Sequence, residues 1–360
     1  MNQELRTKKG FTLIELVVAV ALLVMMLSFS SVIFKGSIGA HRSADASADI
    51  MQKLRAITDQ LNIDFKGLRA DAPLLIWFKQ AENDPSQRYD EIMFFADGDF
   101  QSTQLYKSIG SDREPIPIDE EPQDTADKLI RGNVARIYYG LAQVDSILPW
   151  NMKGDDERKR ILGRRRHILT ADEKLEEWPN ENMTDFDEYE NEHYEHDSLS
   201  LAQWKIVEEN AYEDEIIPTC FDSPAVIDMN DAGTFHKLMC EGVSSFAVQW
   251  AYWDDDPADR TFRWYPNDDP DSDPSTSDSH FDLINIGQNE FGAYFNVPGD
   301  TDLTSEHWYS IEDDNVKYEG GDEFQPGFYP RALKFTFKLY DSKGVIKEGR
   351  EFTHIVYLGE

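Results

Sequence analysis

The sequence is poor in positive charge for a chain of its length. Among 360 residues, 69 are acidic and only 35 are lysine or arginine, which gives a formal net charge of −34. An acid excess of this size repels phosphate and favours a well-solvated protein outside the membrane. A nucleic-acid partner is therefore not favoured.

Motifs for common enzymatic chemistries are missing as well. The sequence has no G-x-S-x-G elbow, no Walker loop and no dinucleotide fingerprint. His193 and His196 are spaced as a zinc pair could be, but they lack the H-E-x-x-H pattern and lie in a hydrophilic stretch. A surface position is favoured for both, and we expect no enzymatic activity and no cofactor.

Cysteine is nearly absent, with only Cys220 and Cys240. In an exported domain an even pair can form a disulfide. Closing a loop of about 20 residues would add roughly 3 kcal/mol of stability on the loop-entropy account. The alternative is two separate buried thiols, and a catalytic cysteine is disfavoured.

The calcium-loop pattern is incomplete. Three aspartates alternate as calcium ligands do: Asp269, Asp271 and Asp273. An EF-hand would then need Gly and Glu where this chain has Pro274 and His280, so the match fails. Two other acid clusters could serve hard cations, residues 254–256 and the pair Asp313 and Asp314. Solvated acid clusters are favoured, and calcium stays a weak alternative.

One long stretch contrasts with this polar composition. From Phe11 to Phe34 the chain runs for 24 residues without a lysine or arginine. Only five of these residues are not apolar: Thr12, Glu15, Ser28, Ser30 and Ser31. About 20 residues suffice to cross a bilayer core. The basic residues that precede the run, Arg6, Lys8 and Lys9, place its N-terminal end in the cytoplasm and the remainder outside.

The junction before the run carries a specific motif. Residues 8–15, Lys-Lys-Gly-Phe-Thr-Leu-Ile-Glu, resemble the N-terminal motif of type IV pilins and of the pseudopilins of type II secretion. The resemblance implies that prepilin peptidase cuts between Gly10 and Phe11 and that the new amino terminus of Phe11 is N-methylated. A signal-peptidase site near residues 37–40 and an ordinary single-span anchor are the alternatives, and the anchor leaves Glu15 unexplained.

Glu15 occupies the position of the glutamate of that family. A carboxylate near the start of a lipid-buried helix costs on the order of a few kcal/mol, so it is a functional candidate. No basic residue of the run can pair with it, and we expect the amine of a neighbouring subunit to do so. Glu15 is therefore interpreted as an assembly determinant.

The pattern predicts an α+β, pilin-like fold, in which a long N-terminal hydrophobic helix packs on an antiparallel β-sheet domain with long acidic loops. The helix is expected to reach about Leu68, roughly 85 Å from Phe11. Apolar residues at three- and four-residue steps mark its second half: Ile50, Leu54, Ile57, Leu61, Phe65 and Leu68. We divide the chain into a leader (1–10), a membrane or filament-core half-helix (11–39), an amphipathic half-helix (40–70) and a periplasmic β-rich domain (71–360). Gly36 and Gly39 are where a bend would cost little.

Alternating or β-branched runs predict the strands at residues 74–78, 90–96, 133–140, 165–169, 243–253, 332–340 and 350–358. The last two are joined by a turn at residues 341–344, and Asp97-Gly98-Asp99 is expected to end the second. Polar insertions are expected at about 172–197 and 254–329.

One basic cluster interrupts the acidic sequence: Arg158, Lys159, Arg160, Arg164, Arg165 and Arg166. It could contact phosphate, as in a pilin that takes up DNA. We favour pairing with the acidic segment that begins at Asp172, or contact with a partner.

The order of elements is similar to that of the J-type minor pseudopilin of type II secretion. That resemblance implies a subunit near the pseudopilus tip that joins other minor pseudopilins and the major pseudopilin, primes assembly and supports export of cargo. It would be a single-pass protein of the bacterial inner membrane with a periplasmic C-terminal domain. A minor type IV pilin with a role in pilus assembly, adhesion or DNA uptake is the alternative.

Overall fold

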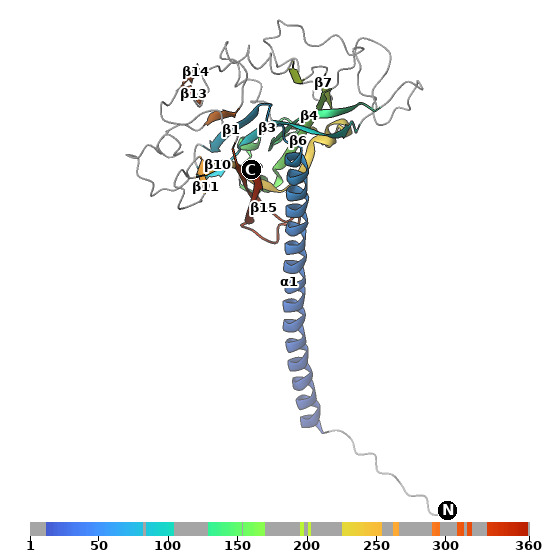
Figure 1. Cartoon of the computed structure of the whole chain (residues 1–360). Coiled ribbons are helices and arrows are strands. Elements are labelled where there is room, and N and C mark those ends of the chain that lie inside the picture. The colour runs from blue at the N-terminus through green and yellow to red at the C-terminus, as the bar shows by residue number, and fades with distance from the viewer. Residues whose placement is uncertain are drawn as a thin grey trace, which may run out of the picture.

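The computed structural model shows a β-rich head on the C-terminal end of one long helix (Figure 1). The structure describes residues 12–81, 84–103, 129–152, 154–169, 195–197, 201–202, 225–253, 262–265, 290–295, 308–312, 315–318 and 330–358. The expected α+β class is confirmed.

The helix, α1, runs from Leu13 to Lys66 without interruption, about 81 Å at 1.5 Å per residue. It passes straight through Gly36 and Gly39, so the bend considered there is not present. It ends at Gly67, where an added Cβ would overlap the carbonyl oxygen of Asp97. Only glycine allows the chain to pass this close to strand β3 (Glu91–Gln101).

A ten-stranded sheet forms the upper layer of the head. Its order is β14-β13-β12-β1-β3-β4-β6-β7, with β2 paired to β1 and β9 paired to β6. The bounds are β1 Leu74–Ala81, β2 Asp84–Arg88, β4 Arg131–Leu141, β6 Ile161–Leu169, β7 His196–Asp197, β9 Leu238–Glu241, β12 Glu290–Phe295, β13 Trp308–Glu312 and β14 Asn315–Tyr318. All of its pairs are antiparallel except β6 with β7.

A four-stranded antiparallel sheet lies beside α1, in the order β11-β10-β15-β16. Its strands are β11 Phe262–Tyr265, β10 Val243–Trp253, β15 Ala332–Leu339 and β16 Arg350–Tyr357. A short parallel pair, β5 Gln143–Val144 with β8 Val226–Ile227, forms a separate two-stranded sheet that packs against the ten-stranded one.

The main core lies where α1 meets the two sheets. Ile57, Leu61 and Phe65 of the helix are buried there with Phe94 of β3 and Phe335 of β15. The Phe65 ring centroid lies 4.1 Å from that of Phe94 and 5.4 Å from that of Phe335. Each such side chain contributes about 1.5–3 kcal/mol when buried, so this contact fixes the helix to the head.

The strands differ from expectation in two places. Asp97-Gly98-Asp99 does not end a strand, because β3 continues to Gln101 with a shift in register between Asp97 and Phe100. Residues 254–329, expected as a polar insertion, supply strands β11 to β14, and β12 pairs directly with β1. Short strands within acidic sequence lack the alternation that would predict them.

Candidate processing and assembly site

Glu15 closes a capping box at the start of α1. Its Oε2 accepts from the Thr12 backbone N–H at 2.9 Å and from the Thr12 hydroxyl at 3.0 Å. The Glu15 backbone N–H donates in return to Thr12 Oγ1 at 3.3 Å. These bonds satisfy donors that every helix N-terminus leaves free. The sequence pattern had pointed only to a missing lysine or arginine partner for Glu15, and it did not predict this neutral partner, Thr12.

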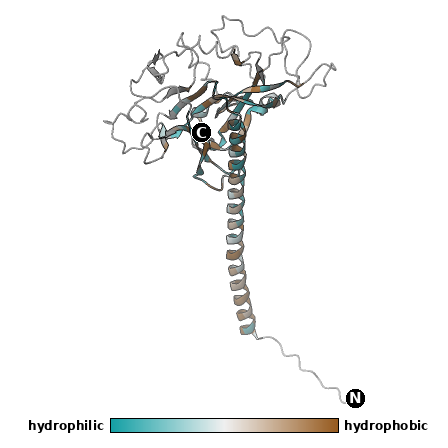
Figure 2. Ribbon diagram, viewed as in Figure 1, coloured by the Kyte–Doolittle hydropathy of each residue, from teal (hydrophilic) through white to brown (hydrophobic). Residues whose placement is uncertain are grey.

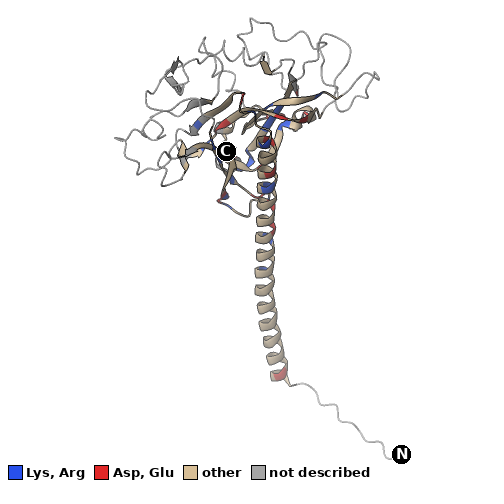
Figure 3. Cartoon of the chain, in the orientation of Figure 1, with Lys and Arg blue, Asp and Glu red and all other residues tan. Residues whose placement is uncertain are grey.

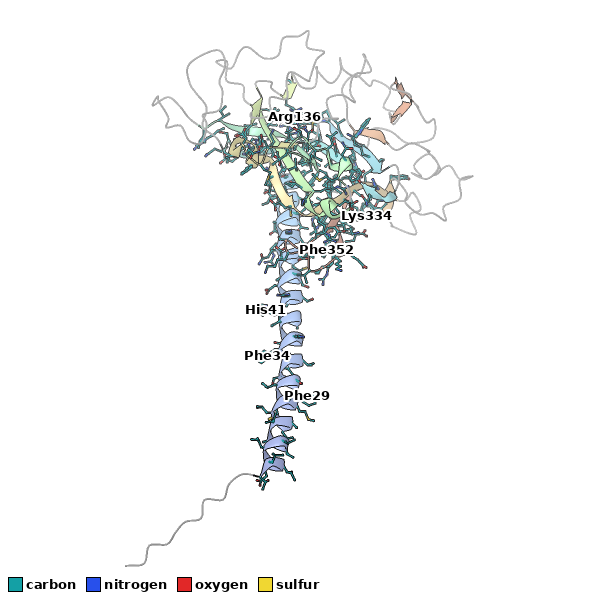
Figure 4. All side chains as sticks on the ribbon, turned by 180° about the vertical axis from the view of Figure 1, so that it is seen from behind. Phe29, Phe34, His41, Arg136, Lys334 and Phe352 are labelled. Atoms are coloured by element: carbon teal, nitrogen blue, oxygen red, sulfur yellow. The ribbon has the colours of Figure 1, made fainter. Side chains whose placement is uncertain are left out.

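The helix that follows is bare. Phe29 is 65% exposed and Phe34 67% exposed, and Figure 4 shows both, with His41, projecting from α1 below the head. In the part of the chain that the structure describes, α1 is the one helix long and apolar enough to cross a membrane, and none of that apolar window is buried. Figure 2 shows the apolar colour along this half and Figure 3 shows the acidic residue at its free end.

The head contacts the helix from about Ala46 onward, partly through the loop between β15 and β16. Asp49 accepts from the Ser342 backbone N–H at 2.7 Å and from its hydroxyl at 2.9 Å. Lys53 Nζ donates to the Tyr340 carbonyl oxygen at 2.9 Å. Partial burial raises the pKa of Asp49, but the Ser342 hydrogen bonds and the Lys53 charge together lower it below its ordinary value.

A buried ion pair holds the last turn of α1. Asp64 is 3% exposed and accepts from Arg164 Nε at 2.7 Å and Nη2 at 2.8 Å, a bidentate pair. Gln60 donates to it at 2.9 Å, and the Tyr139 hydroxyl donates to the same carboxylate. Burial, followed by the Asp64 charge, raises the pKa of Tyr139 well above its ordinary value. All four lone-pair positions of the carboxylate therefore serve the junction of helix and sheet.

Asp64 was not among the predicted site residues, although its position in the sequence carries a signal. Asp64 lies three residues after Leu61 and seven after Ile57, on the apolar face of the helix. A carboxylate that is buried on such a face needs a charged or hydrogen-bonding partner. The predicted strand at 165–169 began one residue too late to suggest Arg164.

The basic cluster is mostly part of the head rather than a phosphate-binding surface. Arg160 is fully buried, and five neutral acceptors hold its guanidinium: the carbonyl oxygens of Pro149, Met152 and Ser244, Gln87 Oε1 and the Tyr89 hydroxyl. Arg158 lies over the Tyr340 ring at 5.7 Å and Arg165 over the Tyr138 ring at 4.5 Å.

Within the basic cluster, Arg166 makes the predicted contact with the acidic segment. Its Nη2 lies 3.5 Å from Glu195 Oε1, and Glu195 belongs to the acidic segment that begins at Asp172. Thr103 donates to the same carboxylate from its backbone at 2.7 Å and from its hydroxyl at 2.6 Å.

Several predicted site residues fall outside the described residues. These are Gly10, Phe11, His193, Cys220, residues 254–256, Asp269, Asp271, Asp273, Asp313 and Asp314. Cys240 is a buried free thiol whose pKa burial raises to about 11, and its disulfide with Cys220 stays a prediction. No group of three metal-ligating side chains occurs among the residues the structure places.

Residues 5–31 match the family model described as the prokaryotic N-terminal methylation motif. Neither a curated protein nor a solved structure matches the chain. The matched residues cover the basic leader, the junction and most of the bare apolar helix, so the signal and the geometry coincide. The chain carries a prepilin-type N-terminus, a mark of structural, non-enzymatic subunits of the type IV pilin-like class that prepilin peptidase processes for filament assembly.

Proposed function

We propose that this protein is a minor pseudopilin of a type II secretion pseudopilus. Prepilin peptidase removes residues 1–10 and methylates Phe11, and α1 then anchors the chain in the bacterial inner membrane with the head in the periplasm. The subunit joins other minor pseudopilins and the major pseudopilin near the fibre tip, where it primes assembly and supports export.

One observation carries the proposal: a prepilin-type signal leads into a helix whose first half packs against no other element in the part of the chain that the structure describes. Residues 13–44 of α1 are exposed throughout, while residues from Ala46 onward pack on the head. A soluble protein would bury an apolar surface of this size. The bare half therefore needs lipid before assembly and neighbouring helices afterwards.

The capping box gives Glu15 a defined place in that assembly. Its carboxylate is held at the helix start by Thr12, the residue that follows Phe11 in the sequence, and Phe11 becomes the amino terminus on leader removal. Both Thr12 hydrogen bonds go to Oε2 of Glu15. A cationic amine from an adjacent subunit can therefore bind Oε1 without breaking the cap. The helices then dock in one register.

Gene deletion in the native host tests the assignment, together with mass spectrometry of the native protein. We expect a mature chain that begins at N-methylated Phe11, loss of exoprotein release in the deletion strain, and unchanged twitching motility. Lost twitching or DNA uptake with normal export would instead make the protein a minor type IV pilin. A mature chain that begins at Met1 would overturn both.

A further inference from the structure

Strand β16 is the outer strand of the four-stranded sheet. It pairs with β15 over its whole length, from Ala332 opposite Tyr357 to Leu339 opposite Arg350, without a shift in register. No other strand pairs with it in the part of the chain that the structure describes. The opposite side of β16 is therefore a sheet edge.

The backbone groups on that edge can be identified. The Leu358 N–H donates to the Arg331 carbonyl oxygen at 2.9 Å, so even-numbered residues of β16 point toward β15. Tyr340, which directly follows β15, agrees, since its N–H donates away from β16, to the Gly242 carbonyl oxygen at 2.9 Å. The groups that point outward therefore belong to Glu351, Thr353, Ile355 and Tyr357. They have no hydrogen-bond partner among the described residues.

This edge lacks the usual protection against pairing. Natural edge strands carry lysine, proline or a bulge, or are very short. The strand is eight residues long and begins with the charged residues Arg350 and Glu351, but residues 352–357 read Phe-Thr-His-Ile-Val-Tyr and include neither lysine nor proline. Helix α1 contacts the strand through even-numbered side chains, from Ser47 to Arg350 and from Asn62 to His354. Tyr357 is 67% exposed and Ile355 37% exposed. Such a strand is suited to accept another one.

Tyr357 belongs to an aromatic group that lies over one face of the four-stranded sheet, with its other members on β11. The Tyr357 ring centroid is 5.8 Å from that of Phe262, which is 5.8 Å from that of Trp264. Lys334 Nζ lies 4.8 Å from the Trp264 ring centroid. Figure 4 shows Phe352 beside α1 and Lys334 further from it. Aromatic side chains of this kind supply much of the energy of protein interfaces.

We propose that β16 is a docking edge to which an extended segment of a different pilin-like subunit adds as an antiparallel or parallel strand. Outward N–H and C=O groups at every second residue match a strand rather than a helix. A second copy of this chain is disfavoured, because two chains of net charge −34 repel. The partner segment carries apolar side chains opposite Ile355 and Tyr357 and a basic one opposite Glu351. This inference rests on the proposed assembly into a fibre.

The test uses the full chain, with a photo-crosslinking amino acid in place of Tyr357. It is co-expressed with each of the other pilin-like subunits of the host in turn. We expect one of them to be captured at least tenfold more than from the same amino acid at Val345, which is 38% exposed on the loop before β16. No product with any subunit, or a product between two copies of this chain, would overturn the proposal.

Proline substitution then tests the strand geometry. Ile355→Pro removes an N–H that points outward and leaves the bonds to β15, so capture should fall at least tenfold. Ile355→Thr keeps the N–H and the β-branched shape and should stay within twofold. Thr353→Pro repeats the test if the first variant unfolds. Unchanged capture in a folded proline variant would refute strand addition. All variants should still lose the leader; failure there would count against the proposed function instead.

Discussion

Glu15 serves two roles that substitution can separate. Its carboxylate caps the helix through Thr12, and its charge is available to a neighbouring amine. Glutamine can accept the same hydrogen bonds but carries no charge. We expect Glu15→Gln to be processed normally and to enter the fibre at least tenfold less than wild type. Glu15→Ala, which also loses the cap, should be no better. Co-purification with the fibre measures this, and wild-type incorporation of the glutamine variant would show that only the cap matters.

Asp64 is expected to be the most sensitive charged residue of the helix. Asp64→Asn removes the negative charge that pairs with the Arg164 guanidinium. Loss of one partner of a buried ion pair typically costs about 3–5 kcal/mol of stability. Asp59→Asn, on the exposed face of the same helix, is the matched control and should change stability by less than about 0.5 kcal/mol. Denaturant unfolding of the full chain in detergent micelles measures both. Equal effects of the two substitutions would contradict the role given to Asp64.

Asp90 is expected to make the stability of the head depend on pH. It is fully buried, and it accepts from Arg88 and from the Val248 N–H at 2.7 Å, which ties β2 to β10. Burial raises the pKa of Asp90 to about 6, against the opposing effect of the Arg88 charge and these hydrogen bonds. An unfolded Asp titrates near about 3.9.

The direction of this pH dependence follows because folded Asp90 keeps its proton to a higher pH than unfolded Asp90 does. The contribution of Asp90 to stability is complete below about pH 4 and is lost as pH rises through 6. The unfolding free energy of wild type minus that of Asp90→Asn should therefore fall between pH 4 and 6, by at most about 1.4 kcal/mol per pH unit. Chemical unfolding at several pH values measures the difference. A flat or rising difference would contradict the prediction.

One glycine within α1 and one directly after its end lie in very different settings. Gly39 has no heavy atom near the position of an added Cβ, while at Gly67 the Asp97 carbonyl oxygen occupies that position. Gly39→Ala should stabilise the helix by about 1 kcal/mol. Gly67→Ala should destabilise the head by about 1–3 kcal/mol, because the helix end must move away from β3. Thermal unfolding of the two variants side by side tests this, and the same sign of effect in both would be evidence against it.

Elements with strong periodicity could be predicted from sequence. The helix, the strand Val243–Trp253 and the final hairpin came out within two residues of their bounds, since each has an apolar face that only one period fits. The insertion of β12 beside β1 could not be predicted, because pairing partners far apart in sequence leave no local pattern. At the site, the Gly10–Glu15 motif and its apolar run were recognisable, whereas Asp64 depended on a contact 100 residues away.

The basic cluster shows that charges adjacent in the sequence need not form one surface patch. Three consecutive arginines on one strand cannot all face the same way, because side chains alternate across a sheet. Arg164 reaches α1 and Arg165 lies over Tyr138. A charge run that looks like one patch in sequence is therefore divided between two faces of the head.

The whole molecule is a rod with a head at one end, and the free part of the rod is longer than a bilayer. Residues 13–44 extend about 48 Å, and a hydrocarbon core takes about 30 Å of that. Lys35 and Arg42 lie in the remaining length, between the apolar run and the head. In the proposed single-pass arrangement, the head would therefore lie about 18 Å beyond the hydrocarbon core.

The net charge of the head determines which other protein surfaces it can contact. Residues 1–44 hold five of the basic and two of the acidic side chains, so residues 45–360 carry a net charge of −37. Two such heads in contact repel over a Debye length of about 8 Å at 0.15 M salt, and less as salt rises. We expect the full chain in detergent micelles to stay monomeric at 0.05 M salt and to form homotypic cross-linked dimers only as salt approaches 1 M. Chemical cross-linking across that range measures it, with a lysine-reactive reagent that does not consume carboxylates. Dimers that are strongest at low salt would mean that specific contacts outweigh the repulsion, and that copies of this subunit can be neighbours in the fibre.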